Sequence, residues 1–271
     1  MIAARISADR LHLQHGPIDL IIGVDGDREA AFAAAEARFS TILEELVAEL
    51  PLLRKPMPVA PRGHVAQRMA RAAAGYRDFV TPMAAVAGAV ADEVLTAIRT
   101  QTRPERAYVN NGGDIAVFLA KGQTFNVGIA GLDAAALGNV TLRSGDGIGG
   151  IATSGQGGRS LSLGIAQSVT VLADCAAVAD AAATLIANRV DLPDHPAITR
   201  ERADRLDPDS DLGDRMVVTG CGPLGAKDKR RALENGARLA QDLQAQGRIK
   251  AAYLLLQGES RVIGIEELAH A

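Results

Sequence analysis

The segment SVTVLADCAAVADAAATLIANR, residues 168–189, carries the most information about the fold. Residues 168–172 predict a strand, and the alanine-rich run that follows predicts a helix over 174–189. Asp174 lies where the strand ends, and a helix-capping role is expected there. Asp180 lies well inside the helix. The residues three and four positions from Asp180 include no cation, so no local ion pair can form.

Asp180 and Thr184 are spaced four residues apart and therefore share one face of the predicted helix. A carboxylate and a hydroxyl are the kind of hard oxygen ligands that suit Mg²⁺, which usually keeps waters and bridges to substrate phosphates. Two alternatives stay open, an exposed aspartate or an aspartate paired with a distant arginine.

A second predicted helix, residues 82–99, repeats this pattern around Asp92, which also has no cation at helical spacing. Gly88 lies in the same helix, where glycine costs ~1 kcal/mol relative to alanine. Close approach of another backbone or of a ligand is therefore expected at Gly88, with ordinary helix packing as the simpler explanation.

The composition excludes several classes of protein. Aromatic residues make up 3% of the 271 residues and Trp is absent, which argues against a binder of single-stranded nucleic acid. The net charge of −3 gives no general field for phosphate backbones. No apolar run approaches the ~20 residues of a membrane span. Two separated cysteines and no secretory signal favour the cytoplasm.

The remaining periodicities predict an α+β protein in which mixed helices pack on a largely antiparallel sheet. Residues 1–271 are interpreted as a single domain, although two clasped subdomains would give a similar pattern. Helices are expected at 27–50, 63–75, 82–99, 174–189 and 226–246. Strands are expected at 4–13, 18–24, 107–110, 115–120, 124–130, 140–143, 149–153, 160–163, 168–172, 216–218, 251–257 and 261–265.

Glycine clusters beside the predicted strands are candidate anion-binding loops, because glycine lets backbone N–H groups turn toward a phosphate. They lie at 110–114 (NNGGD) and 147–158 (GIGGIATSGQGG). A dinucleotide fingerprint needs a helix directly after the loop, whereas the second cluster leads into predicted strands. A phosphate-binding P-loop and a serine-hydrolase frame are absent from the sequence. The acidic stretch 204–214 is expected to be a surface loop rather than a calcium site.

Taken in order, these segments resemble the ApbE-like family, the FAD:protein FMN transferases. Residues 111–115 (NGGDI) look like its GGD/GGN-I strand turn, and residues 151–155 (IATSG) look like its ATSG segment. Residues 168–184 resemble its s-V-T-V…A-D-a-l-a-T segment, and 84–92 (AAVAGAVAD) a degenerate G-a-i-A-K-G-y-a-v-D. The resemblance extends from residue 18 to about residue 190.

The resemblance implies that Asp180, Thr184 and a backbone carbonyl at Ala84 hold Mg²⁺ against the pyrophosphate of FAD. The residues expected to bind the nucleotide are Asn111, Gly112, Gly113, Asp114, Thr153, Ser154, Gly155 and Arg159. The expected partner is a small-molecule nucleotide, with neither nucleic acid nor a membrane, and the sequence leaves a homo-oligomer open.

The chain departs from the transferase pattern where the family carries H-x-x-D-P-R-T-G. Here residues 156–167 (QGGRSLSLGIAQ) contain neither His nor Asp, and Ala87 replaces the family lysine. The chain thus resembles the cytoplasmic, functionally uncharacterised branch of the family. The resemblance implies a Mg²⁺-dependent FAD-binding protein, with FMN transfer or FAD pyrophosphate cleavage as its reaction. The alternatives are a non-catalytic flavin-nucleotide binder and an enzyme for another phosphorylated ligand, and the catalytic residues are unknown.

Overall fold

The computed structural model describes residues 1–56, 60–130, 136–158 and 160–264. The chain forms two compact units. The first contains Met1–Asn126, Thr141–Ala152 and Ala173–Ala181, and the second contains Val127–Val140, Thr153–Leu172 and Ala182–Ala271. Strand β8 (Gly150–Ser154) and helix α4 (Ala176–Arg189) each begin in the first unit and end in the second.

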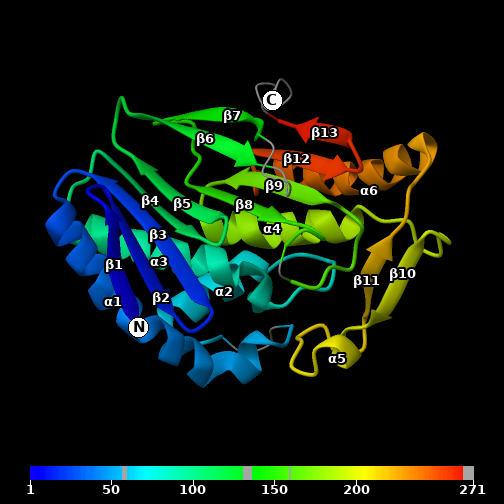
Figure 1. Ribbon diagram of the computed structural model, residues 1–271, viewed down its shortest axis with the longest axis horizontal. Helices are drawn as coiled ribbons and strands as arrows, with labels where there is room; N and C mark the ends of the chain where they lie inside the picture. Colours follow the sequence, from blue (N-terminus) through cyan, green and yellow to red (C-terminus); the bar gives the residue numbers. More distant parts are fainter. Residues whose placement is uncertain (57–59, 131–135, 159, 265–271) are drawn as a thin grey trace. The chain divides into compact units, whose positions relative to one another are not determined.

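The sheet of the first unit is antiparallel, in the order β1-β2-β3-β4-β5-β8 (Figure 1). The strands other than β8 are β1 (Ile2–Ser7), β2 (Arg10–His15), β3 (Ile18–Asp25), β4 (Arg106–Asn111) and β5 (Asp114–Leu119). The single strand expected over 4–13 is wrong. The chain turns at Ala8 and Asp9, where the Ser7 hydroxyl donates to the Asp9 carboxylate at 2.7 Å.

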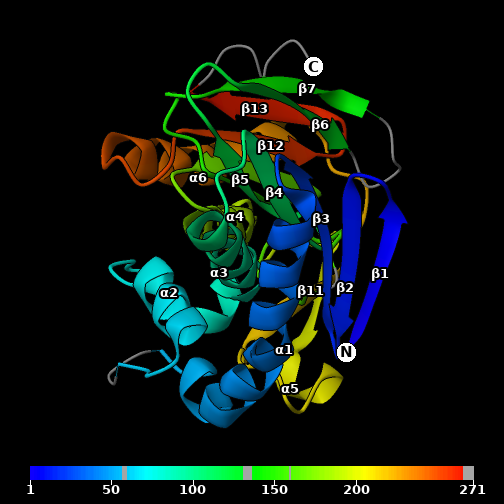
Figure 2. The ribbon, with the colours of Figure 1, turned by 90° about the vertical axis from the view of Figure 1, so that its left-hand side faces the viewer.

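The helices of the first unit pack together on one face of this sheet (Figure 2). They are α1 (Arg28–Leu53), α2 (His64–Ala73), the short 3₁₀ turn η1 (Pro82–Ala85) and α3 (Val86–Gln101). Asp27 caps α1 as expected, because its carboxylate accepts from the Ala30 N–H at 3.2 Å. The helix continues past Pro51, which has no N–H to donate to the carbonyl of Val47, an exposed residue.

The core of the first unit lies between the sheet and these helices, because both present apolar side chains to the same layer. Fully buried members include Leu11, Leu13, Leu20, Ile22, Phe32, Phe39, Ile42, Val94, Ile98 and Val109. The alanine-rich faces of α3 and α4 belong to the same cluster, so small side chains let these helices approach closely.

The second unit has its own antiparallel strands, in the order β9 (Ser168–Ala173), β12 (Ala251–Leu256) and β13 (Glu259–Ile263). Helix α6 (Ala226–Ala245) packs against β12 and β13. A separate ribbon pairs β10 (Ile198–Arg202) with β11 (Met216–Cys221), next to the one-turn helix α5 (Ala203–Leu206). Strands β6 (Thr124–Ala130) and β7 (Ala136–Arg143) form another two-stranded ribbon.

The strand expected at 160–163 is wrong. In the second unit the Ser162 hydroxyl donates to the Gly164 carbonyl at 3.1 Å, and the Leu163 N–H donates to the Asn188 side chain at 3.0 Å. These local bonds satisfy the backbone that a strand would have paired with a neighbour.

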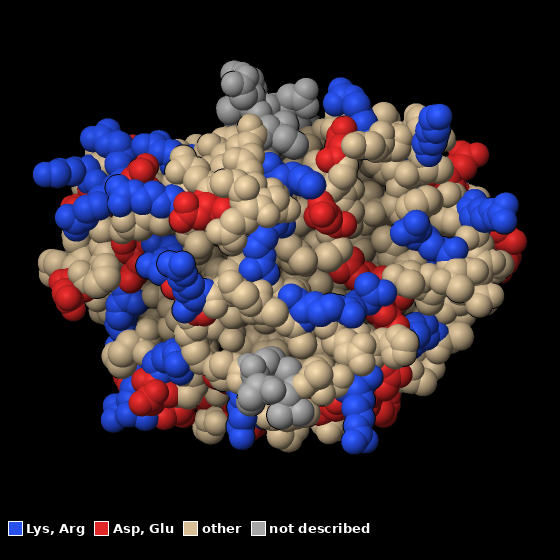
Figure 3. Space-filling model, turned by 180° about the vertical axis from the view of Figure 1, so that it is seen from behind, with Lys and Arg blue, Asp and Glu red and all other residues tan. Residues whose placement is uncertain are grey.

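Helices packed on largely antiparallel sheets confirm the expected α+β class. Within the described ranges, no helix is long and apolar enough to cross a membrane. On the face drawn in Figure 3, Lys and Arg are interspersed with Asp and Glu, in keeping with the small net charge.

Candidate functional site

The beginning of α4 is capped by an aspartate from another helix. Asp92 of α3 accepts hydrogen bonds from the N–H of Ala176 at 3.0 Å and from the N–H of Ala177 at 2.9 Å. These N–H groups have no partner within their own helix, because the first turn of a helix leaves its donors free. Asp92 is only 7% exposed, and this burial raises its pKa, although the two N–H groups oppose the shift.

The beginning of α3 is capped in return by an aspartate of α4. Asp180 accepts from the Gly88 N–H at 3.0 Å, and the Ala87 N–H also favours its ionised form. The two helices therefore exchange carboxylates, each at the positive end of the other helix dipole. Asp92 and Asp180 have no cation at helical spacing in their own helices, and each is instead hydrogen-bonded to backbone N–H groups of the other helix.

The N–H groups of Gly88 and Ala87 stabilise the ionised form of Asp180, but they do not offset the effects that raise its pKa. Burial raises its pKa well above the ordinary value, and the nearby carboxylate of Asp114 adds to the shift, with a smaller contribution from Asp92. Two carboxylates at close range disfavour each other's ionised forms. A cation bound to Asp180 would relieve this repulsion.

Three glycines let the backbone close around the beginning of α4. A Cβ on Gly88 would lie 2.3 Å from the Ala176 carbonyl oxygen, and one on Gly149 would lie 2.3 Å from the Asp174 carbonyl oxygen. A Cβ on Gly150 would lie 2.1 Å from the Ala176 nitrogen. The backbone approach expected at Gly88 is confirmed. Gly149 and Gly150, expected in a phosphate-binding loop, pack against protein backbone.

The hairpin between β4 and β5 lies next to this pair of helices. Asn111 is 7% exposed, and its side-chain N–H donates to the Ala87 carbonyl at 3.1 Å, which fastens the hairpin to the start of α3. Gly112 and Gly113 form the turn with φ of 64° and 114°. No atom lies within 4 Å of a Cβ position on Gly113, so its backbone faces open space.

Thr153, Ser154 and Gly155 of the ATSG segment lie in the second unit. The Thr184 hydroxyl is 3.4 Å from that of Ser154, and the Thr153 hydroxyl pairs with that of Thr170 at 2.8 Å. Gly155 has a φ of 144°, and a Cβ there would lie 2.7 Å from the Gln167 carbonyl oxygen. Ser154 of this segment therefore contacts α4 at Thr184.

The two remaining expected site residues are Ala84 and Arg159. Ala84 lies in η1, where its N–H donates to the Thr81 carbonyl at 3.1 Å. Arg159 lies outside the described residues. In the described part of the chain, no three His, Cys, Asp or Glu side chains gather as a metal cluster. A set built on one carboxylate, a hydroxyl and a carbonyl would not form such a cluster.

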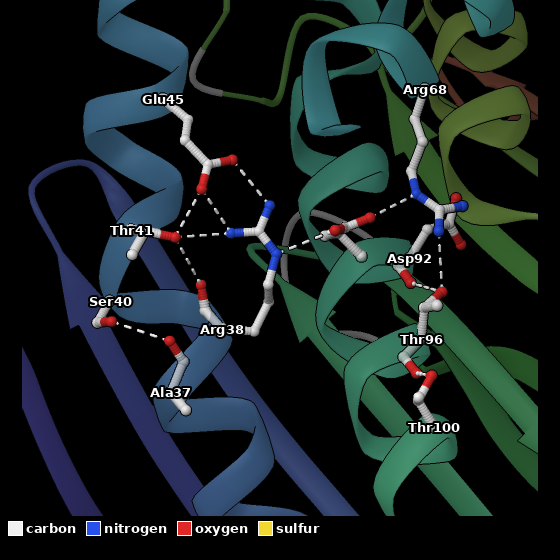
Figure 4. Close-up of polar contacts among 10 residues, drawn as sticks. Ala37, Arg38, Ser40, Thr41, Glu45, Arg68, Asp92, Thr96 and Thr100 are labelled. Carbon is white, nitrogen blue, oxygen red and sulfur yellow. Dashed lines mark hydrogen bonds and ion pairs between the residues drawn. The ribbon is translucent and has the colours of Figure 1, made fainter. Parts of the chain in front are cut away.

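A second carboxylate on α3, which the sequence interpretation missed, ties the helices of the first unit together. Glu93 accepts from Arg38 of α1 at 3.0 Å and from Arg68 of α2 at 2.8 Å. Arg38 also binds Glu45 through two bonds of 2.8 Å, and Arg68 donates to the Thr96 hydroxyl at 3.0 Å (Figure 4). No sequence signal indicated this network, because its partners lie 55 and 25 residues from Glu93.

The protein is thus of the α+β class, and an aspartate lies at the N-terminus of each of two neighbouring helices, α3 and α4. A family model described as "AbpE bacteria" matches residues 3–262, and the chain belongs to this family. The resemblance to ApbE-like proteins is thereby confirmed.

Two relatives are named UPF0280 protein. That of Methanothrix thermoacetophila is 35% identical over 195 residues, covering 66% of this chain and 78% of the relative. That of Methanothermobacter thermautotrophicus is 34% identical over 156 residues, covering 56% of this chain and 59% of the relative. The match to the second relative thus spans less than two thirds of its length.

Two solved structures align over nearly the whole of this chain but have low sequence identity to it. The apo flavinyl transferase ApbE of Pseudomonas stutzeri aligns with a TM-score of 0.49 and 11% identity, covering 100% of this chain and 98% of that one. The flavin transferase ApbE of Vibrio cholerae aligns with a TM-score of 0.43 and 12% identity, covering 97% and 99%.

Proposed function

We propose that this protein binds a flavin nucleotide, FAD, together with Mg²⁺. The observation that carries the proposal is the meeting of three segments in the first unit. Asp180 of α4 accepts a hydrogen bond from Gly88 at the start of α3, and the charge of Asp114 raises its pKa further. The hairpin that contains Asp114 is hydrogen-bonded to the neighbouring Ala87 through Asn111. Family membership supports the proposal, as do the printed names of the flavin transferases from Pseudomonas and Vibrio.

The donor chemistry fits Mg²⁺. A carboxylate has two oxygens, each able to accept more than one bond, so the Gly88 N–H leaves Asp180 capacity for a cation. We assign Asp180 as the carboxylate ligand, Thr184 from the next turn of α4 as the hydroxyl ligand, and the carbonyl of Ala84 as the third. Oxygen ligands of this kind suit Mg²⁺. The bound ion would supply positive charge to neutralise a pyrophosphate.

The nucleotide contacts are assigned to backbone and small side chains. The Gly113 N–H already donates to the Asn110 side chain at 2.8 Å, so we assign the Gly112 N–H as the donor of this turn. The turn has open space beside Gly113, and Asn111 pairs with Asp114 across its base. Ser154 and its neighbours Thr153 and Gly155 offer hydroxyl and backbone groups in the second unit. Arg159 would add a cation for phosphate.

The chemical outcome separates two versions of the proposal. If the bound FAD reacts with water, its pyrophosphate is cleaved to FMN and AMP. If it reacts with an acceptor group, the products are an FMN-modified acceptor and AMP. If the loss of His and Asp from residues 156–167 removes proton transfer, FAD remains intact, because such catalysis typically contributes 10²–10⁴-fold. An enzyme for another phosphorylated ligand is the remaining alternative.

Incubation of the purified protein with FAD and Mg²⁺, followed by separation of FAD, FMN and AMP, tests the proposal. Retained FAD or released FMN that depends on Mg²⁺ supports it, and the balance of products decides between binding and reaction. If FAD is neither retained nor converted, both versions fail. Retention of a different phosphorylated compound would then favour the remaining alternative.

A further inference from the structure

Two neighbouring acids on α3 are buried to the same degree but hold different parts of the first unit. Asp92 is 7% exposed and Glu93 is 8% exposed. Glu93 faces the arginines of α1 and α2, whereas Asp92 faces the beginning of α4. The chain therefore offers a matched pair of carboxylates, of which one contacts the helix that carries Asp180.

The contacts of Asp92 and Asp180 close a ring between α3 and α4. The two oxygens of Asp92 each accept one N–H, from Ala176 and from Ala177. Asp180 follows Ala176 by four residues, about one helical turn, and returns to α3 at Gly88. Gly88 precedes Asp92 by four residues, again about one turn. Two rigid turns and three hydrogen bonds thus set where the Asp180 carboxylate lies.

We propose that Asp92 is a positioning residue for the Mg²⁺ and nucleotide site assigned to Asp180. It acts through the beginning of α4 and touches neither the ion nor the nucleotide. The inference rests on the proposed function, because it assigns a role to Asp92 in the same site. Removing a group that orients a metal ligand without touching the metal typically lowers metal affinity by about 10- to 100-fold.

Three variants separate positioning from charge and from stability. Asp92→Asn keeps the shape but offers a single acceptor oxygen, and Asp92→Glu keeps the charge but displaces it by one methylene. Glu93→Gln is the matched control, because it disturbs the adjacent carboxylate and the arginine network without touching α4. Each variant is titrated with Mg²⁺ at pH 8 in the presence of FAD, and its unfolding by urea is followed separately.

We expect Asp92→Asn and Asp92→Glu to weaken the apparent affinity for Mg²⁺ by roughly 10- to 100-fold. Glu93→Gln should unfold at lower urea yet bind Mg²⁺ and FAD like the wild type. Wild-type affinity in Asp92→Glu would overturn the inference, because charge alone would then suffice. Equal loss of affinity in Glu93→Gln would also overturn it, because a general loss of stability would explain both.

Failure of the proposed function gives a different result. If the wild type shows no Mg²⁺-dependent retention of FAD, the proposed function and this inference both fall, whereas wild-type binding with unaffected Asp92 variants removes the inference alone. If an Asp92 variant does not fold, hydrogen exchange on the wild type replaces it. Mg²⁺ with FAD should then slow exchange of the Ala176 and Ala177 amides, and unchanged exchange at both would overturn the inference.

Discussion

Replacing Gly88 by alanine tests the close approach of α3 and α4. Gly88 lies in the first turn of α3, and propensity alone would make this change stabilising by up to about 1 kcal/mol, the value for a helix interior, because alanine is the better helix former. Here the added Cβ would lie 2.3 Å from the carbonyl oxygen of Ala176, 2.4 Å from its carbonyl carbon and 2.7 Å from the Ala177 nitrogen. Ordinary contact begins near 3.5 Å, so the start of α4 must move by about 1 Å.

That movement has a cost that follows from the contacts. Overpacking typically costs about 1–3 kcal/mol. The bonds from Asp92 to Ala176 and Ala177, now 3.0 and 2.9 Å, would lengthen beyond useful range, and bonds to charged groups are worth about 1.5–3 kcal/mol each. Partial relaxation keeps the total below the sum. After subtracting the gain in helix propensity, we expect a net loss of roughly 2–4 kcal/mol.

Urea unfolding measures this loss as a lower midpoint with an unchanged slope. Gly236→Ala on α6 is a comparison variant, since a Cβ there first meets a Val190 methyl group at 2.4 Å rather than backbone. Its loss should be smaller, because a side chain yields more easily than a helix terminus. If Gly88→Ala stabilises the protein by about 1 kcal/mol, as propensity alone predicts, the described packing of α3 on α4 is wrong.

Three further predictions concern single groups. Burial opposes ionisation of Glu93, but Arg68 and Arg38 together lower its pKa below the ordinary value. Its contribution to stability is therefore present above about pH 4.5 and is lost as the pH falls through the lower native pKa. In urea unfolding, Glu93→Gln should cost about 1–3 kcal/mol at pH 7 and less in acid, whereas a cost that does not fall with pH would contradict this. Burial and the charge of Asp92 raise the pKa of Cys175 to about 11. In a Cys221→Ser variant, a thiol reagent should therefore label Cys175 slowly at pH 8, with a rate that rises about tenfold per pH unit, and fast labelling at pH 8 would refute the burial. Gly113→Ala should destabilise the hairpin by about 1–2 kcal/mol through its positive φ alone, since the space around it is open, and a neutral effect on the urea midpoint would argue against that turn.

The periodic parts of the fold could be predicted because their signals are local. The cap of α1 by Asp27, the hairpin around Gly16 and the main helices follow from spacing and turn residues. The strand expected at 160–163 was wrong because short alternation cannot be distinguished from a turn that Asn188 stabilises from 25 residues away.

The acidic residues of the candidate site could be predicted from the sequence, but their hydrogen-bond partners could not. Asp180 and Asp92 could be selected as acids without a local cation, but their partners lie 92 and 84 residues away in the chain. A single sequence gives no information about such pairings. Gly149 and Gly150 show the opposite error, because a glycine that admits a neighbouring backbone has the same letter as one that admits a phosphate.

The role of Asp180 in Mg²⁺-dependent FAD binding is tested by equilibrium binding of FAD to the wild type and to Asp180→Asn, each with Mg²⁺ and with a chelator. We expect the wild type to bind FAD with Mg²⁺, and the chelator and the substitution each to abolish that binding. A folded Asp180→Asn variant that binds FAD with wild-type affinity and the same dependence on Mg²⁺ would contradict that role.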